Sequence, residues 1–507
     1  MELELKQEQL QGFERSREVL LPTEETLEYI VPDYCPDIGR ILCCSGTVFL
    51  RSKDCQDGRL ELGGIVRTTV LYLPENSSAV RSLEVAVPFL CRGEERGLEG
   101  NICLQARGQL QEAEARLLNP RKLLLRVSVL GRAEVYQYRS LSYTAEAVAE
   151  EDMELQQRKQ CGETDIICCV KEKEFTFMDE ICIPAGREEI GELLQCDSRL
   201  ELAESRVLGK KLLLKGTVLT QLLYRGRDGG LCTWQSDLPL TQVVELEEAA
   251  ENCSAEVSLQ QLGCEYQQPE NEGRTVTLNL FLRCQLTLRE SRAFSWLTDA
   301  YSTRFETQVQ RQQLPLVHWR GHPAQRQTLR EVLETGAVVK TVLSARGHCE
   351  AVRCSREGAL LTMHSTVELS VLYLDENDTP LLAERRLEVS HSCQVGQNSH
   401  CSAEIHCGDI SCAAAGNGME LRFCVDFTLQ EFCCSQESAV TELCLGEPLD
   451  FSKAPSIVLR SLQLHESLWE VAKRYSSTEE EIRRANELEE EAELPAGRLL
   501  LIPRCRK

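Results

Sequence analysis

The residues of this chain best suited to chemistry are its thiols and imidazoles, 26 cysteines and eight histidines. Seven of the histidines lie between His318 and His406, and three adjoin a cysteine, as in His348-Cys349. Thiolate and imidazole are good zinc ligands, so a metal-dependent redox protein is one hypothesis. However, adjacent residues of a strand point to opposite faces, and such a pair is poorly placed to share one ion. We therefore expect neither a metal nor a cofactor.

The usual enzymatic motifs do not occur in this sequence. It contains no Walker-type phosphate loop, no H-E-x-x-H, no G-x-S-x-G and no C-x-x-C. We therefore predict that the protein is not an enzyme. About one residue in twenty is cysteine, below the ~8–10% typical of a disulfide scaffold. The first residues, MELELKQEQL, lack the features of a signal peptide. Together these observations indicate reduced, structural thiols and a cytoplasmic protein.

The charge balance limits the possible partners. The chain has 80 acidic and 56 basic residues and a net charge of -24. Nucleic-acid sites are basic, so binding to nucleic acid is not expected. The same argument applies to an anionic membrane surface. No run of 18 apolar residues occurs, so we also predict no transmembrane segment.

One alternating stretch occurs three times. GIVRTTVLY at 64–72 returns as GTVLTQLLY at 216–224 and as STVELSVLY at 365–373. Apolar residues at every second position predict a strand with one buried face. The copies are 152 and 149 residues apart, which is the length of a whole domain. We therefore expect one domain type, used three times.

A proline-rich loop precedes the first of these strands. Its apolar residues Ile38, Ile41 and Leu42 have the spacing of one helical turn, with an aspartate placed as the N-cap. The loop is either a partner-binding loop or a fixed turn that starts the helix. We favour the fixed turn because the proline-to-apolar spacing recurs. The motif residues are Pro32, Asp33, Pro36 and Asp37, with Pro184 and Pro323 as the matching prolines of the later repeats.

The strands and turns predict a mainly β protein with a small α+β part. We expect three sandwich-like or barrel-like repeats followed by a C-terminal βααβ module. The charge and weak pattern of AEAVAEEDMELQQRKQ suggest a solvated helix in the first linker. The expected divisions are a lead-in 1–24, repeat one 25–142, a linker 143–172, repeat two 173–295, a linker 296–313, a divergent repeat three 314–436, a linker 437–455, and the module 456–504.

The C-terminal segment contains clear helix-start signals. Ser467 followed by Glu470 forms a capping box before an apolar helical pattern, and Thr478 opens a second helix. A strand at 457–462 precedes them, and a returning strand at 499–502 follows. The predicted order is therefore strand, helix, helix, strand.

This segment resembles the LysM module. The matching positions are His465-Glu466-Ser467, Leu468, Val471-Ala472, Tyr475, Thr478, Ile482, Asn486-x-Leu488, Gly497 with Leu500, and Ile502-Pro503. The family's turn Gly-Asp is replaced by His465-Glu466. Many LysM modules bind N-acetylglucosamine polymers in a groove beside this turn, and here the facing loop is the acidic Glu489–Glu493. We therefore expect the module to bind a protein, with an exposed Trp469 as anchor. The expected contact residues are His465, Glu466, Ser467, Trp469 and Asn486.

The three repeats look like the SPOCS domain of endospore-forming bacteria, most clearly in VPDYCPDIGRIL. SPOCS repeats followed by a LysM module are similar to clostridial spore-coat morphogenetic proteins of the SipL type. The resemblance implies a scaffold of the mother-cell cytoplasm at the forespore surface. Such a scaffold would bind the coat morphogenetic ATPase and other coat proteins. The alternative is a peptidoglycan-binding LysM protein of the spore or cell envelope.

Overall fold

The computed structural model of the chain describes residues 3–97, 102–247, 253–268, 273–415, 418–452, 455–489 and 495–504. Within them, strands account for almost everything up to Pro448. A βααβ unit follows, so the expected mainly β fold is confirmed. None of the helices in these ranges has the length and apolar character needed to cross a membrane.

The first two repeats contain six strands each, in the same order. Strands β7, β8 and β9 begin 152 residues after β1, β2 and β3, which is the offset of the sequence motifs. The first set is β1 (Leu3–Ile30), β2 (Ile38–Gln56), β3 (Arg59–Pro74), β4 (Arg81–Glu94), β5 (Ile102–Asn119) and β6 (Lys122–Ala149). The second is β7 (Leu155–Cys182), β8 (Ile190–Leu208), β9 (Lys211–Gly226), β10 (Leu231–Glu245), β11 (Ser254–Gln267) and β12 (Thr275–Ser302).

The third repeat has the same plan, with two strands broken in two. Its strands are β13 (Phe305–Gly321), β14 (Gln325–Glu334), β15 (Val339–Cys349), β16 (Arg353–Glu357), β17 (Leu360–Asp375), β18 (Pro380–Gln394), β19 (His400–Ala415) and β20 (Gly418–Pro448). The pair β13 and β14 runs along β20 as the single strand β1 runs along β6. Strands β15 and β16 both pair with β17, as β2 pairs with β3.

Each repeat is a sandwich of two antiparallel sheets. In the first repeat, β2-β3-β4 form one sheet and β1-β6-β5 belong to the other. Tyr72, Tyr224 and Tyr373 lie on β3, β9 and β17, each of which is flanked on both sides within its sheet. All three side chains are buried. The prediction that the three copies share one fold is therefore confirmed.

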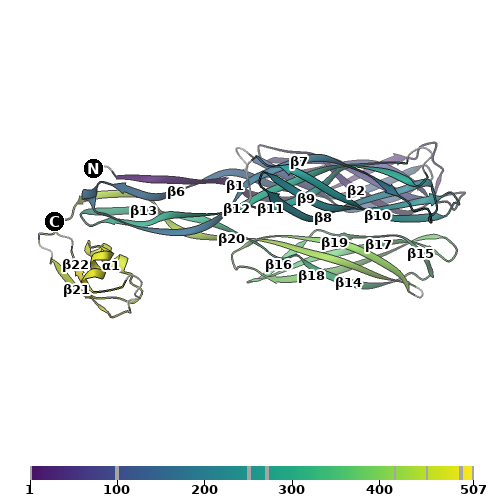
Figure 1. The fold of residues 1–507 in the computed structure, drawn as a ribbon. Helices are drawn as coiled ribbons and strands as arrows, with labels where there is room; N and C mark the ends of the chain where they lie inside the picture. The colour runs from purple at the N-terminus through teal and green to yellow at the C-terminus, as the bar shows by residue number, and fades with distance from the viewer. Residues whose placement is uncertain are drawn as a thin grey trace.

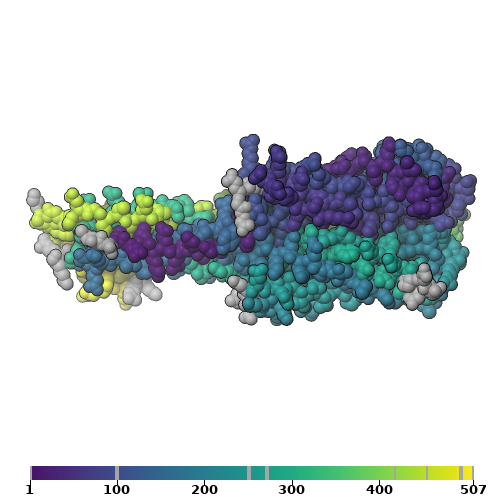
Figure 2. Space-filling view, turned by 90° about the horizontal axis from the view of Figure 1, so that it is seen from above, coloured from purple at the N-terminus to yellow at the C-terminus, as the bar shows by residue number. Residues whose placement is uncertain are grey.

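Long strands extend beyond the three sandwiches as a narrow bundle (Figure 1). We call this bundle the stalk, and the sandwiches the head. Figure 2 shows the same division from above, with the thin stalk leading into the wider head. Three hairpins pack together in the stalk, one from each repeat, so equivalent residues meet in its core. The stalk consists of residues 3–13, 141–149, 155–165, 294–302, 305–316 and 435–448.

The stalk corrects the expected lead-in and linkers. Residues 1–24 were expected to precede the first repeat, but β1 begins at Leu3 and pairs with β6 along its whole length. The predicted solvated helix within 143–172 is wrong, because this segment contains the end of β6, a short 3-10 turn at Glu151–Met153 and the start of β7. The segments 296–313 and 437–455 also lie largely in strands. A thin stalk buries few side chains, so its strands have the charged composition of a linker.

The predicted helical turn at residues 38–42 is also wrong. These residues begin β2, and two of the three register shifts of β2 against β3 fall among them, at Ile38/Arg40 and at Ile41/Cys43. Each bulge inserts one residue and shifts which side chains face the core. The apolar spacing therefore imitates a helix while the backbone is extended. The equivalent strand β8 has bulges at the matching positions.

Candidate functional site

The C-terminal module has the predicted order of elements. It consists of β21 (Ile457–Ser461), α1 (Leu468–Tyr475), α2 (Glu479–Ala485) and β22 (Leu499–Pro503). The Ser467 side chain accepts from the Glu470 backbone N–H, and the Glu470 side chain accepts from the Ser467 N–H, so the capping box is confirmed. The Thr478 side chain accepts from the Glu481 backbone N–H and so caps α2. Of the acidic loop Glu489–Glu493, only Glu489 belongs to the described residues.

Three of the predicted partner-binding residues make bonds within the module. The Glu466 carboxylate pairs with Arg460 at 2.9 Å and Arg474 at 3.1 Å, and its side chain is 6% exposed. The Asn486 side chain donates to the Leu501 carbonyl and accepts from the Leu501 N–H. Ser467 is the N-cap of α1. These side chains therefore hold the fold of the module together.

His465 is the exposed member of the predicted set. Its φ of 63° lies in the left-handed region, which glycine adopts far more easily than other residues. The LysM pattern has glycine at this position, and in this chain a histidine occupies it. The result is an imidazole presented to solvent beside Leu464, which is 74% exposed.

Trp469 is not the exposed anchor that we expected. The indole is 7% exposed because the module rests against the end of the stalk. Its Nε1–H donates to Asp299 at 2.8 Å. Its ring lies 4.9 Å from the ring of Tyr301, edge to face. Asp299 and Tyr301 come from the last residues of strand β12, 170 and 168 positions earlier in the chain. No local sequence pattern could therefore connect them to the module.

An open apolar surface lies on the opposite side of the module. In the two-stranded sheet, residues of β21 and β22 that face each other point the same way. The inner face is buried against the helices. On the outer face, Ile457 is 57%, Leu459 62% and Leu499 57% exposed. We call Ile457, Leu459, Leu499, Leu501 and Pro503 the outer sheet face.

The loop at 31–37 is a fixed turn, held by an arginine that we did not predict. Arg121, in the turn between β5 and β6, donates to the carbonyls of Val31 and Cys35. It also pairs with Asp33 and Asp37, at 3.1 Å each. Pro36 lies exposed in the same loop. The favoured interpretation, a rigid turn, thus has a physical basis, although the turn leads into a strand and not a helix.

The later prolines do not all occupy this turn. Pro184 does, and Arg274 binds its carbonyl as Arg121 binds that of Val31. Pro323 does not, because it lies between β13 and β14. Proline has no backbone N–H to give to a sheet. The break between β13 and β14 therefore falls at Pro323, one strand earlier than the motif predicted.

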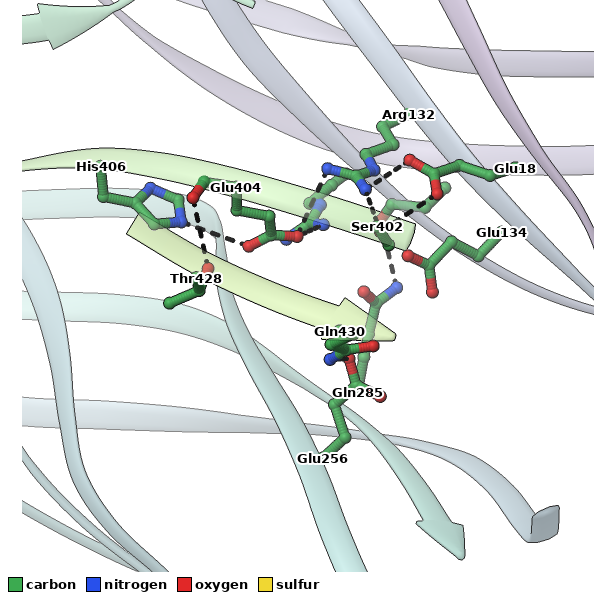
Figure 3. Close-up of polar contacts among 12 residues, drawn as sticks. Glu18, Arg132, Glu134, Glu256, Gln285, Ser402, Glu404, His406, Thr428 and Gln430 are labelled. Atoms are coloured by element: carbon green, nitrogen blue, oxygen red, sulfur yellow. Dashed lines mark hydrogen bonds and ion pairs between the residues drawn. The ribbon is translucent and has the colours of Figure 1, made fainter. Parts of the chain in front are cut away.

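An open cavity of about 740 Å³, lined by both polar and apolar side chains, lies in the head where the three repeats meet. A network of ion pairs and hydrogen bonds around Arg132 and Glu404 crosses it (Figure 3). Arg132 of the first repeat donates to Ser402 of the third at 2.9 Å and pairs with Glu18 and Glu404. Arg107 also pairs with Glu404. These contacts join the first repeat to the third. We therefore interpret the cavity as the polar seam that fixes how the repeats pack.

The thiols and imidazoles are dispersed through the sheets. Within the described ranges every cysteine is free. No group of three His, Cys, Asp or Glu side chains there is arranged to hold a metal ion. His348 is largely buried, and burial lowers the pKa of its imidazole. The third repeat thus gives no support to metal chemistry in the part of the chain that the structure describes.

Two family models match the chain. Residues 189–267 match a model described as SipL, SPOCS domain, and this match runs from β8 to β11 of the second repeat. Residues 463–503 match the LysM domain. Neither the curated proteins nor the solved structures contain a match to this chain. Both matched domains are of kinds that bind and do not catalyse.

Proposed function

We propose that this protein is a non-enzymatic adaptor of spore-coat assembly. The proposal is supported by its SPOCS and LysM domains, which point to a sporulation-associated protein with a module of the glycan-binding class. In this proposal it acts in the mother cell at the forespore surface. Its LysM module captures the coat morphogenetic ATPase, and its repeats engage other coat proteins.

The observation that carries the proposal is the open outer sheet face at one end of a long molecule. Three aliphatic side chains more than half exposed on one small sheet are costly in water, and a protein partner would cover them. Strand β1 alone has 28 residues, which at about 3.3 Å per residue corresponds to roughly 90 Å. A molecule of this shape can link two partners while keeping a fixed distance between them.

Binding of the purified ATPase to the purified full-length chain tests the proposal. Leu459→Asp places a charge in the outer sheet face and should weaken binding by about tenfold or more, since hot-spot truncations commonly cost ~2 kcal/mol. Val332→Asp is the matched control, because Val332 is 61% exposed but lies on β14. Equal affinities of Leu459→Asp and the unaltered chain would contradict this surface. Absence of binding by the unaltered chain would contradict the function.

A glycan is the second candidate ligand, and the LysM match itself favours it. The exposed turn at His465 is the side of the groove that the family uses for N-acetylglucosamine polymers. Titration of the full-length chain with an N-acetylglucosamine hexamer separates the candidates. Saturable binding that His465→Ala abolishes and Leu459→Asp leaves intact would support the glycan.

A further inference from the structure

The carboxylate of Asp299 is the centre of the contact between stalk and module. It accepts from the Trp469 indole at 2.8 Å and from the Lys473 ammonium at 2.6 and 2.9 Å. Arg311 of the stalk approaches it at 2.5 Å, and the side chain is 14% exposed. Burying a charge is costly unless it is paired and hydrogen-bonded. Two of its three side-chain partners come from α1, so the stalk end is satisfied only when the module is in place.

Tyr301 adds a shape-specific contact next to this charge. Its side chain is 2% exposed and is packed with the core of the module. The hydroxyl donates to the Ser477 carbonyl at 2.8 Å, and the ring meets the indole edge to face at 73°. Edge-to-face pairs of this kind are a favoured aromatic geometry. The stalk thus supplies both a charge and an aromatic surface to α1.

Only one of the three stalk hairpins combines these two residues. The strands β6, β12 and β20 are equivalent, since Ala147, Ala300 and Leu443 occupy the same place in the stalk core. The residue directly before each of these three is acidic in every hairpin. The residue directly after each of them differs between the hairpins. The equivalent pairs are Glu146 with Val148, Asp299 with Tyr301, and Glu442 with Cys444. Val148 is 52% exposed, so the first hairpin presents an open surface where the second docks the module.

The connection between stalk and module is short. Eight residues separate Pro448 from Ile457, and fully extended they reach about 28 Å. A tether of this length gives the module an effective concentration at the stalk end of roughly millimolar. At this effective concentration even a weak contact keeps the module docked on the stalk for most of the time. Loss of the central residues of the contact should release the module.

We propose that the stalk end is a docking site built for the LysM module and that it sets the module's orientation. We call Asp299 and Tyr301, together with Trp469 and Lys473, the latch. The latch engages α1. The outer sheet face lies on the side of the two-stranded sheet that points away from the helices, and β21 is drawn farther from the stalk than α1 (Figure 1). The docked module therefore keeps its apolar surface turned away from the stalk. In this state the whole chain is one rigid connector.

Hydrogen exchange of the full-length chain tests the latch. Asp299→Glu combined with Tyr301→Val gives the second hairpin the residues that the first hairpin carries at the same backbone positions. Amides of α1 should then exchange about tenfold faster, because the helix loses its cover. Amides of β21 and β22 should keep their protection, because they pair with each other. Small-angle scattering should show the module leaving its fixed position.

The matched control is Glu146→Asp combined with Val148→Tyr, which changes the first hairpin and should leave the exchange of α1 unaltered. Unchanged α1 exchange in the Asp299→Glu, Tyr301→Val chain would overturn the proposal. Equal loss of protection in α1, β21 and β22 would also overturn it, since Tyr301 would then belong to the module's fold and not to a latch. Neither readout depends on what the module binds.

Discussion

Glu431 on β20 illustrates how much a single buried side chain depends on its partners. The carboxylate is fully buried. It accepts from the Gly396 N–H at 2.5 Å and lies 2.8 Å from His322 Nε2. Burial by itself raises the pKa of Glu431, but the hydrogen bonds from Gly396, His322 and Ser399 outweigh it and lower the pKa to about 2. This carboxylate is therefore adapted to its ionised form.

We predict that Glu431 makes the third repeat sensitive to acid. Its folded pKa lies below the unfolded value of about 4.3. Its contribution is therefore complete above that pH and is lost as the pH falls toward 2. The loss amounts to about 3 kcal/mol at most, at 1.36 kcal/mol per pKa unit. Denaturant unfolding at several pH values measures it, and Glu431→Gln should flatten the dependence in this window. An unchanged acid profile in Glu431→Gln would contradict the assignment.

The buried thiols should be chemically inert in the folded protein. Burial, with a smaller effect of the neighbouring Cys43, raises the pKa of Cys44 to about 12. Burial raises the pKa of Cys284 to about 12 as well. The thiolate is the reactive form, so both should react slowly at neutral pH.

Alkylation followed by mass spectrometry measures this reactivity. In the native chain, iodoacetamide should label the exposed Cys434 well before Cys44 or Cys284. After denaturation without reductant it should label nearly all 26 cysteines. Recovery of defined intramolecular disulfides would contradict the interpretation of these residues as reduced, structural thiols.

At the scale of elements, one position explains why the second strand of the third repeat is broken. Gly64 and Gly216 let the neighbouring strand approach closely, and a Cβ at Gly64 would lie 2.2 Å from the Phe49 carbonyl oxygen. The third repeat has Ser365 at this place, and its hydroxyl donates to the Glu350 carbonyl at 2.9 Å. There β15 ends at Cys349, and the pairing resumes with β16.

We therefore predict that Gly64→Ala destabilises the sheet β2-β3-β4. The added methyl group would overlap the backbone of β2 and the ring of Phe89, 2.9 Å away. Overpacking of this kind typically costs about 1–3 kcal/mol. Denaturant unfolding and hydrogen exchange of β2 would detect the change. Gly186→Ala is the control, because a Cβ there has no heavy atom within 4 Å, and an equal effect of the two substitutions would contradict the steric explanation.

At the scale of the whole molecule, packing of the repeats depends on the polar seam around the cavity. Glu404 of the third repeat forms ion pairs with Arg107 and Arg132 of the first. The exposed fractions of these two arginine side chains are 29% and 16%. Removal of the acid would leave two poorly solvated guanidinium groups with one partner fewer.

Glu404→Gln should therefore loosen the third repeat from the rest of the head. Breaking a buried ion pair costs about 3–5 kcal/mol, and partial exposure of this pair places the expected loss nearer 2 kcal/mol. Calorimetry should show the third repeat unfolding at a lower temperature than the first two. Glu388→Gln is the control, because its pair with Arg353 is 3.4 Å long and more than half exposed. The same unfolding temperature of the third repeat in both variants would contradict a role of the seam.

Some features of this protein are determined by local sequence. The alternation around Tyr72, Tyr224 and Tyr373 predicted equivalent strands, because a two-residue period places one face against a core in any sheet. The caps at Ser467 and Thr478 predicted both helices of the module, because they satisfy backbone groups only three residues away. The turn at His465 was expected from the resemblance to the LysM pattern.

Other features depend on contacts between distant residues, which local periodicity does not encode. The sequence predicted a linker where the stalk lies, because each strand there becomes stable only when three hairpins pack together. It predicted an exposed Trp469, because the covering residues Asp299 and Tyr301 belong to another repeat. The two bulges at the start of β2 imitated a helix for the same reason, since a bulge is defined by its partner strand. Tertiary structure alone decided these points, because the free energy that fixes them comes from surfaces brought together by folding.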